Sequence, residues 1–276
     1  MPSKFNQALA DVDERVREKV VAIYEKADEM LQARMESELK TKLTKARVNA
    51  TISYMENVTR QAIVQTKPAI DEGVQSSYVL GALQVDVSLD KEDTITFEKL
   101  SPAQREQVAA LSEEAYLNFA KTLTVVSNSA RQTLNEALRR QIRERVTTGI
   151  LLGDSVESIA KDLREEIFTP SGITAFVKKN GARLSLRDYS RTVTRSMIIK
   201  SANEGTAARM GALKLTVFQI STHAGGAEDA ACADHQGVLY DWTGKQYPKP
   251  QAEDIPPYHP NCRHIIQPRP DLQFSK

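Results

Sequence analysis

The first 69 residues carry apolar side chains at steps of mostly three and four, the spacing that places side chains on one face of a helix. Charged residues fill most positions between them. We therefore predict long amphipathic helical structure from about Phe5 to Ala69, with a seam like that of a coiled coil. Such a stripe must be buried, either on its own chain as a helical hairpin or on a partner. Its members are Phe5, Leu9, Val12, Val16, Val20, Ile23, Ala27, Met30, Leu31 and Met35, then Val48, Ile52, Met55, Val58, Ala62 and Ile63.

The pattern changes twice before the next helical run. Residues 83–89 alternate apolar and polar side chains, which predicts a half-buried strand or an extended arm. Ser101 and Pro102 then provide a helix cap and a first-turn proline, and we predict a second long helix that ends near Val146. Its last turns hold four arginines, and cations at that end favour the helix dipole. They are Arg139, Arg140, Arg143 and Arg145.

After Gly153 the predicted elements are shorter and mixed. Asp154 and Glu157 indicate the start of a short helix over 155–167, and Asn180-Gly181 is typical of a tight hairpin turn. A further helix is predicted from Ser185 to Met210. Three short strands are predicted over residues 215–221, 238–240 and 263–266. The fold class is therefore α+β: long N-terminal helices in residues 1–152, as a helical hairpin or a coiled-coil-like rod, and a small α+β domain in residues 153–276.

Every histidine and cysteine of the chain lies between His223 and His264. Two pairs, Cys232 with His235 and His259 with Cys262, are each separated by two residues. This spacing allows one turn of the chain to offer two ligands to a tetrahedral zinc ion. His223 fits such a site least well, because Gly225 and Gly226 separate it from the pairs. A knot held by hydrogen bonds alone, without metal, stays open as the alternative. The candidate ligands of a structural zinc ion are Cys232, His235, His259, Cys262 and His264.

The same residues also allow two catalytic interpretations. Cys232, His259 and Asn261 provide the nucleophile, base and orienting amide of a cysteine hydrolase. However, the sequence has no flanking signature of that class. Asp234-His235 followed by Asn261 and His264 follows the order of an HNH-type nuclease, in which a histidine activates water beside a metal. Its last spacing is too short, so a structural role is favoured.

Composition limits the classes of partner. The chain has 276 residues, of which 41% are hydrophobic and 26% charged, enough to bury a substantial core. A net charge of +1 creates no overall field that would attract nucleic acid or a membrane surface. The sequence shows neither an apolar run of about 18 residues nor a signal core, which predicts a protein without a membrane anchor that is made in a cytoplasm. Two cysteines in so long a chain fit a reducing compartment, in which they are thiols or thiolate ligands, and a disulfide between Cys232 and Cys262 stays open as the alternative.

Several strings in the C-terminal part resemble the minor head proteins of tailed bacteriophages, the Mu F-like head morphogenesis proteins, and most closely the group called phage minor capsid protein 2. The resemblance covers about Gly153 to Pro268. The chain departs from it at His235, where members often have a second cysteine, and at Ser196, where they have threonine. The strings are residues 180–189, 194–196, 203–205, 221–225, 232–237 and 258–264, the last reading Tyr-His-Pro-Asn-Cys-Arg-His.

The resemblance implies a non-enzymatic virion protein, present in a few copies inside the capsid or at the portal vertex. It implies the portal protein and the major capsid protein as partners, and a role in head assembly and in DNA packaging or delivery. The N-terminal helices offer a route to homo-oligomers. The competing function is a metal-dependent hydrolase or nuclease that acts at DNA ejection. Weak contact with packaged DNA would use Arg139, Arg140, Arg143, Lys178, Lys179 and Arg183.

Overall fold

The computed structural model describes residues 4–39, 45–91, 95–120, 175–177, 183–222, 230–259 and 262–274. Contacts divide the chain into two compact units, and each is described by itself. The first contains Met1–Glu18, Pro68–Tyr116 and Arg191–Lys276, and the second contains Lys19–Lys67 and Leu117–Ser190. The predicted boundary at residues 152 and 153, the helix over 155–167, the Asn180-Gly181 turn and the four arginines from 139 to 145 lie outside the described residues.

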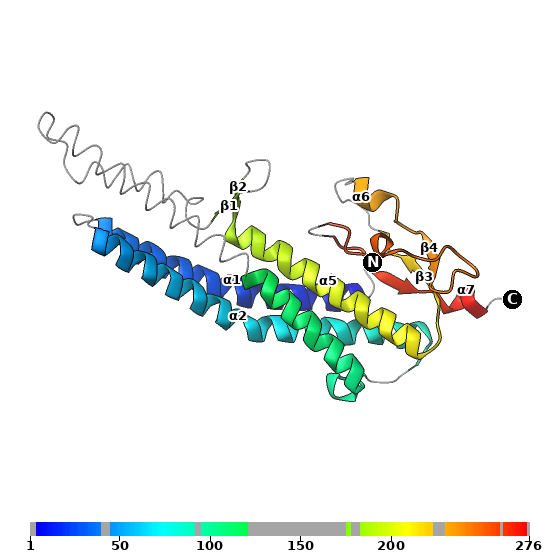
Figure 1. Ribbon diagram of the computed structural model, residues 1–276. Helices are drawn as coiled ribbons and strands as arrows, with labels where there is room; N and C mark the ends of the chain where they lie inside the picture. Colours follow the sequence, from blue (N-terminus) through cyan, green and yellow to red (C-terminus); the bar gives the residue numbers. More distant parts are fainter. Residues whose placement is uncertain are drawn as a thin grey trace, which may run out of the picture. The chain divides into compact units, whose positions relative to one another are not determined.

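The predicted long N-terminal helices are confirmed. They are α1, Lys4–Leu39, and α2, Lys45–Ser88 (Figure 1). In the first unit Arg15 on α1 forms an ion pair of 3.0 Å with Glu72 on α2. In the second unit the Arg34 guanidinium lies 5.5 Å from the centre of the Tyr54 ring. Each contact joins an early residue of α2 to a late residue of α1, or the reverse, so the two helices run antiparallel as a hairpin.

Residues 83–88 are helical, so the strand or extended arm predicted over 83–89 was wrong. α2 continues to Ser88, with Pro68 inside it. The reason is visible in the burial, because Tyr78, Ala82 and Val85 are fully buried at helical steps of four and three. Val87, which belongs to the alternating pattern, is 70% exposed. The alternation over residues 83–89 therefore does not determine which side chains are buried, and the helical spacing does.

The helix of residues 102–120 begins as the sequence predicted. Ser101 accepts a hydrogen bond from the Gln104 N–H at 3.3 Å, and the Gln104 side chain accepts one from the Ser101 N–H at 3.0 Å. This reciprocal arrangement is a capping box, and it satisfies two backbone donors that the first helical turn leaves without partners. The short 3-10 helix η1, Phe97–Lys99, precedes it.

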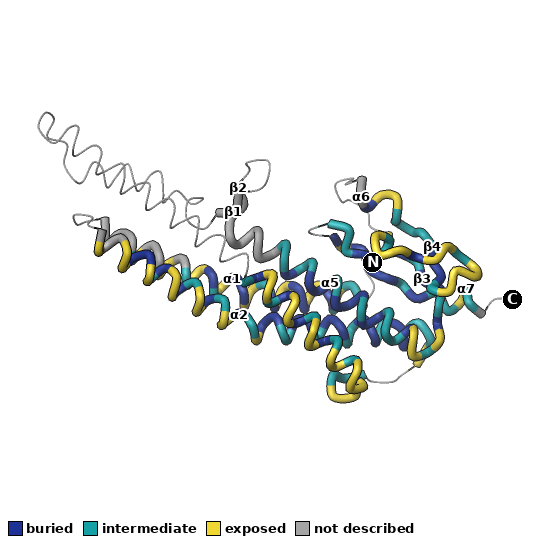
Figure 2. The backbone as a smooth tube through the Cα atoms, viewed as in Figure 1, coloured by how far each residue is buried: buried dark blue, intermediate teal, exposed yellow. Residues whose placement is uncertain are grey.

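Helix α5, Leu186–Ala212, packs closely on α2 inside the first unit. A Cβ atom on Gly81 would lie 1.9 Å from the Ala202 carbonyl oxygen, and one on Gly205 would lie 2.0 Å from the Tyr78 carbonyl oxygen. Only glycine permits two backbones to approach this closely. Figure 2 shows buried positions recurring along both helices. The predicted helix from Ser185 to Met210 is thus confirmed, and its hairpin strands precede it as β1, Ala175–Val177, and β2, Arg183–Ser185.

Two buried carboxylates form ion pairs that connect α5 to α2 and to α1. Arg209 on α5 contacts Asp86 on α2 at 2.7 Å, and Asp86 is fully buried. Arg195 on α5 contacts Asp13 on α1 at 3.3 Å. Burial raises the pKa of Asp13, and the charge of Arg195 acts against that rise. These pairs fix the rotation of α5 about its axis, which decides the face that it presents to the C-terminal sheet.

That sheet has three antiparallel strands in the order β4-β3-β5. They are β3, Val217–Ile220, β4, Leu239–Asp241, and β5, Ile266–Pro268. The strands predicted over 215–221 and 238–240 are confirmed, whereas the third lies later than predicted. Next to the β3–β5 pairing, the Ser221 N–H donates to the Ile265 carbonyl at 3.0 Å, whereas the Ile265 N–H donates to the Ser221 hydroxyl at 3.0 Å and not to a backbone carbonyl.

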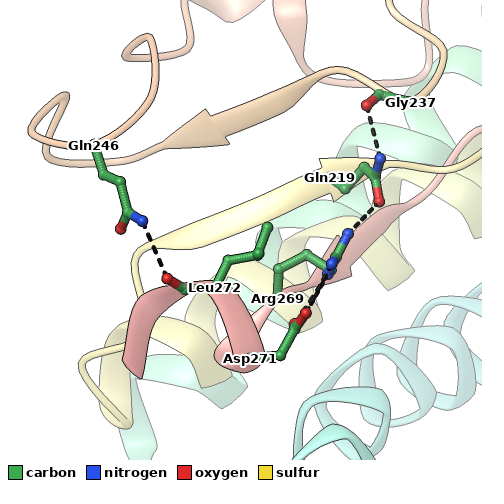
Figure 3. Close-up of polar contacts among 6 residues, drawn as sticks. All are labelled: Gln219, Gly237, Gln246, Arg269, Asp271 and Leu272. Atoms are coloured by element: carbon green, nitrogen blue, oxygen red, sulfur yellow. Dashed lines mark hydrogen bonds and ion pairs between the residues drawn. The ribbon is translucent and has the colours of Figure 1, made fainter. Parts of the chain in front are cut away.

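The sheet covers the end of the α2–α5 pair with a shared apolar core. Its buried members are Val85, Met210, Leu215, Phe218, Ile220, Tyr240 and Ile266. Polar contacts connect the segment around α7, Pro270–Phe274, to β3 and to the chain after β4 (Figure 3). Arg269 donates to Gln219 at 2.7 Å and forms an ion pair with Asp271, and Gln246 donates to the Leu272 carbonyl at 3.1 Å. The chain after β5 is therefore held to the sheet.

Candidate metal centre

Both two-residue pairs predicted from the sequence form tight turns. The His235 N–H donates to the Cys232 carbonyl at 3.2 Å, and the Cys262 N–H donates to the His259 carbonyl at 3.0 Å. The first turn begins inside α6, Ala230–Ala233, and the second lies between the 3-10 helix η2, Ala252–Asp254, and β5. Such a turn brings its first and last residues close together, which is why a two-residue spacing suits two ligands of one metal ion.

The structure brings four of the five predicted ligands together. The Sγ atoms of Cys232 and Cys262 and a ring nitrogen of His264 all lie within 4.8 Å of one another. His259 Nε2 lies 2.8 Å from Cys232 Sγ, and His264 Nδ1 lies 3.5 Å from Cys262 Sγ. We call Cys232, His259, Cys262 and His264 the clasp.

Three of the four clasp residues are buried, and His259 is half-buried. Cys232, Cys262 and His264 are 6%, 1% and 5% exposed, and both cysteines are free thiols. Burial matters because it removes the water that would otherwise compete for a metal or a hydrogen bond. The short contacts from imidazole to thiol are hydrogen bonds that hold the clasp together, and the donor atoms of Cys232, Cys262 and His264 form a group that could hold a metal.

His235 is the predicted ligand that the structure places elsewhere. Its ring stacks on Tyr258, with the ring centres 4.4 Å apart, and Nδ1 lies 3.3 Å from the Tyr240 hydroxyl. That hydroxyl donates to Asp254 at 3.1 Å, and the His235 Nδ1 lies 3.6 Å from the same carboxylate. Burial, with the Asp254 carboxylate beside it, raises the pKa of Tyr240 to about 12. His235 therefore belongs to a hydrogen-bonded group next to the clasp.

Tyr258 contacts both groups. Its ring lies 5.8 Å from that of His264 and stacks on His235, and its hydroxyl donates to the Asp254 carbonyl at 2.9 Å. Burial raises the pKa of Tyr258, so the hydroxyl stays protonated and serves as a donor. Sequence reasoning missed this role, although Tyr258 directly precedes the second pair.

Two thiols and two imidazoles are the ligand set of closed structural zinc sites. Thiolate favours soft or borderline ions over magnesium or calcium, which prefer oxygen. In a tetrahedral zinc site, ligand atoms at bond lengths of about 2.0 to 2.3 Å lie roughly 3.3 to 3.8 Å apart. Within the clasp, the 3.5 Å contact between His264 Nδ1 and Cys262 Sγ lies in that range, whereas the 2.8 Å contact between His259 Nε2 and Cys232 Sγ is shorter and is typical of a hydrogen bond. The donor set thus fits zinc by number and type, and the donor atoms of Cys232, Cys262 and His264 lie within 4.8 Å of one another.

Two other residues that fix the clasp were not recognised as such in the sequence. Asn203 on α5 and Ser221 after β3 are both buried, and both bond to the backbone of the second pair's segment. The sequence offers only a weak signal for them, which is a polar residue on the buried side of a helix or strand. His223 and Asn261, which entered the sequence interpretations, lie outside the described residues.

Comparison with known proteins gives a family match. The sequence profile of a family described as phage minor capsid protein 2 matches residues 14–268, which include the helical part and the clasp. No curated protein and no solved structure matches the chain significantly. Among the described residues, none of the helices combines the length and the apolar character that crossing a bilayer would require.

Proposed function

The chain belongs to the phage minor capsid protein 2 family, and from this membership we propose that it is a non-enzymatic structural component of the virion. It would lie inside the capsid or at the portal vertex and bind the portal protein and the major capsid protein there. Its work would be head assembly and DNA packaging or delivery. The observation that carries the proposal is the extent of the family match, which includes both the long helices and the clasp.

The two parts of the chain would divide this work. The α1–α2 hairpin provides long amphipathic helices, a form that suits docking on neighbouring subunits or on a second copy of the chain. The C-terminal sheet and the clasp provide a compact folded part. Because its strands have only three or four residues, a crosslink that does not depend on core size would stabilise this part.

We propose that zinc is that crosslink and that the clasp holds it. Cys232, His259, Cys262 and His264 would be the four ligands, and His235 would support the site from outside through Tyr258. The burial and closeness of the Cys232, Cys262 and His264 donor atoms support this, and so does the 2.8 Å contact of His259 Nε2 with Cys232 Sγ. A closed site adds folding free energy, because the ligands are assembled only in the folded chain.

Purified virions test the virion role directly. The protein should be found in DNA-filled particles and should crosslink to the portal protein or the major capsid protein. Both partners should also retain it in a pull-down at moderate salt. Particles that assemble, package DNA and infect normally without this protein would contradict the role, as would its absence from washed virions.

The competing function is a metal-dependent hydrolase or nuclease that acts at DNA ejection. One observation favours it: Cys232, Cys262 and His264 form a three-residue group, and catalytic zinc sites use three protein ligands and an open position for water. The distance of 2.8 Å between His259 and Cys232 favours a closed site. Zinc-loaded protein that cleaves DNA or peptidoglycan, and loses cleavage but not zinc on His259→Ala substitution, would establish the enzyme instead.

A further inference from the structure

Asn203 on α5 holds both ends of the segment that carries three clasp residues. Its side-chain Nδ2 donates to the Pro256 carbonyl at 3.0 Å, and its Oδ1 accepts from the Ile266 N–H at 2.9 Å. Residues 256–266, which we call the ligand segment, contain His259, Cys262 and His264. One amide therefore bonds to both ends of the ligand segment, at Pro256 shortly after η2 and at Ile266, the first residue of β5.

The chemistry of the two partners requires an amide. The Pro256 carbonyl can only accept and the Ile266 N–H can only donate, so a single orientation of the Asn203 side chain satisfies both. Aspartate at this position would offer only acceptors and would face the carbonyl with a negative charge. Since Asn203 is 3% exposed, water has little access to replace a lost bond.

Helix α5, which carries Asn203, is held against α2. Two positions further on, Gly205 lies against the Tyr78 backbone, and the Thr206 hydroxyl donates to the Gly81 carbonyl of α2 at 3.0 Å. On the sheet side, the Ser221 N–H donates to the Ile265 carbonyl at 3.0 Å, next to His264. The ligand segment is thus held between a rigid helix pair and β3.

We propose that Asn203 is the positioning residue of the metal centre. It sets zinc affinity by keeping the ligand segment closed before the ion arrives, so that less conformational entropy is lost on binding. It touches no ligand atom and acts only through the backbone at residues 256 and 266. The proposal rests on the proposed zinc clasp, and it adds that α5, through Asn203, affects how tightly the clasp binds zinc.

Full-length wild type, Asn203→Asp and Asn203→Ser test it, with Thr206→Val as matched control. Thr206 is equally buried and lies on the same helix, but it bonds to α2 and not to the ligand segment. Zinc affinity is measured by competition with a chromogenic chelator, and the absorption of bound Co²⁺ reports ligand geometry. Thermal unfolding with chelator present reports the metal-free fold.

Wild type should bind one zinc ion per chain. Both Asn203 variants should bind it about tenfold or more weakly, the size of effect seen for residues that orient metal ligands. Their Co²⁺ spectra should differ from that of wild type. Thr206→Val should lower the unfolding temperature with and without metal and leave zinc affinity and the Co²⁺ spectrum unchanged.

Wild-type affinity in Asn203→Asp would overturn the positioning role, and so would an equal loss of affinity in Thr206→Val. If Asn203→Asp does not fold, Asn203→Ser decides by the same criteria. If both fail to fold in chelator while Thr206→Val folds, Asn203 is a general folding residue and the proposal is overturned. Wild type that binds no zinc refutes the metal clasp itself, which separates that failure from the failure of Asn203.

Discussion

The α2–α5 helix pair and the clasp lie in the same compact unit but are built on opposite principles. The helix pair is held by close backbone packing at Gly81 and Gly205 and by a continuous apolar face. The clasp depends on a few polar side chains, each with a specific partner. If the clasp holds zinc as proposed, we expect removal of the metal to destabilise the clasp and to leave the helix pair intact. Sensitivity to chelator should then distinguish the two regions.

The largest expected effect is on the helix pair. In Gly81→Ala the new Cβ would meet the Ala202 carbonyl oxygen at 1.9 Å, so α2 and α5 must separate. We expect a loss of at least about 3 kcal/mol in the free energy of unfolding. Urea denaturation should show the same loss with and without chelator.

Gly211→Ala is the matched control, because a Cβ there meets nothing within 4 Å. It should be neutral or slightly stabilising, as expected when alanine replaces a helical glycine. Equal stability of the two variants would contradict the close approach of the helices.

A slightly smaller effect is expected for Arg209→Met. The substitution leaves the fully buried Asp86 carboxylate without its guanidinium partner. Breaking a buried pair in this way should cost roughly 3 kcal/mol. The control is Lys200→Met, whose partner Glu114 is exposed, and which should change stability by less than about 1 kcal/mol. Matching denaturation curves for the two variants would show that Asp86 does not need Arg209.

The third prediction concerns the sheet beside the clasp. Asp241 is buried, which by itself raises its pKa, but the N–H groups of Thr243 and Gln246 and the Thr243 hydroxyl outweigh burial and lower the pKa to about 2. Ionised Asp241 therefore stabilises the fold above about pH 4, and this contribution is lost as the pH falls towards 2.

Asp241→Asn should thus lose roughly 2 kcal/mol at neutral pH, and its difference from wild type should shrink between pH 4 and pH 2. Unfolding midpoints in urea across this range measure the difference. A constant gap between the two proteins at all pH values would show that the carboxylate charge is not the cause.

Much of this architecture is predictable from local pattern. The long helices, the Ser101 cap and the clustering of cysteine and histidine all depend on residues close in sequence, and the structure confirms them. The helical state of residues 83–88 was mispredicted, because the alternation of apolar and polar residues concealed the helical spacing of Tyr78, Ala82 and Val85. Pattern alone does not show which period controls burial.

Long-range contacts account for what sequence reasoning missed. Asn203 is 53 residues from Pro256 and 63 from Ile266, and no local pattern links these positions. His235 has the spacing of a ligand, yet its ring stacks on Tyr258 and bonds to Tyr240. Spacing can bring two donors to one turn, but the packing of distant side chains decides which way a ring faces.

Zinc content of the purified chain tests the central claim most directly. Elemental analysis after dialysis without chelator should find one zinc ion per chain in wild type and in His235→Ala, and none in Cys262→Ser. Chelator should lower the unfolding temperature of the first two proteins and leave that of Cys262→Ser unchanged. Wild type without zinc, or Cys262→Ser with a full equivalent, would contradict the metal clasp.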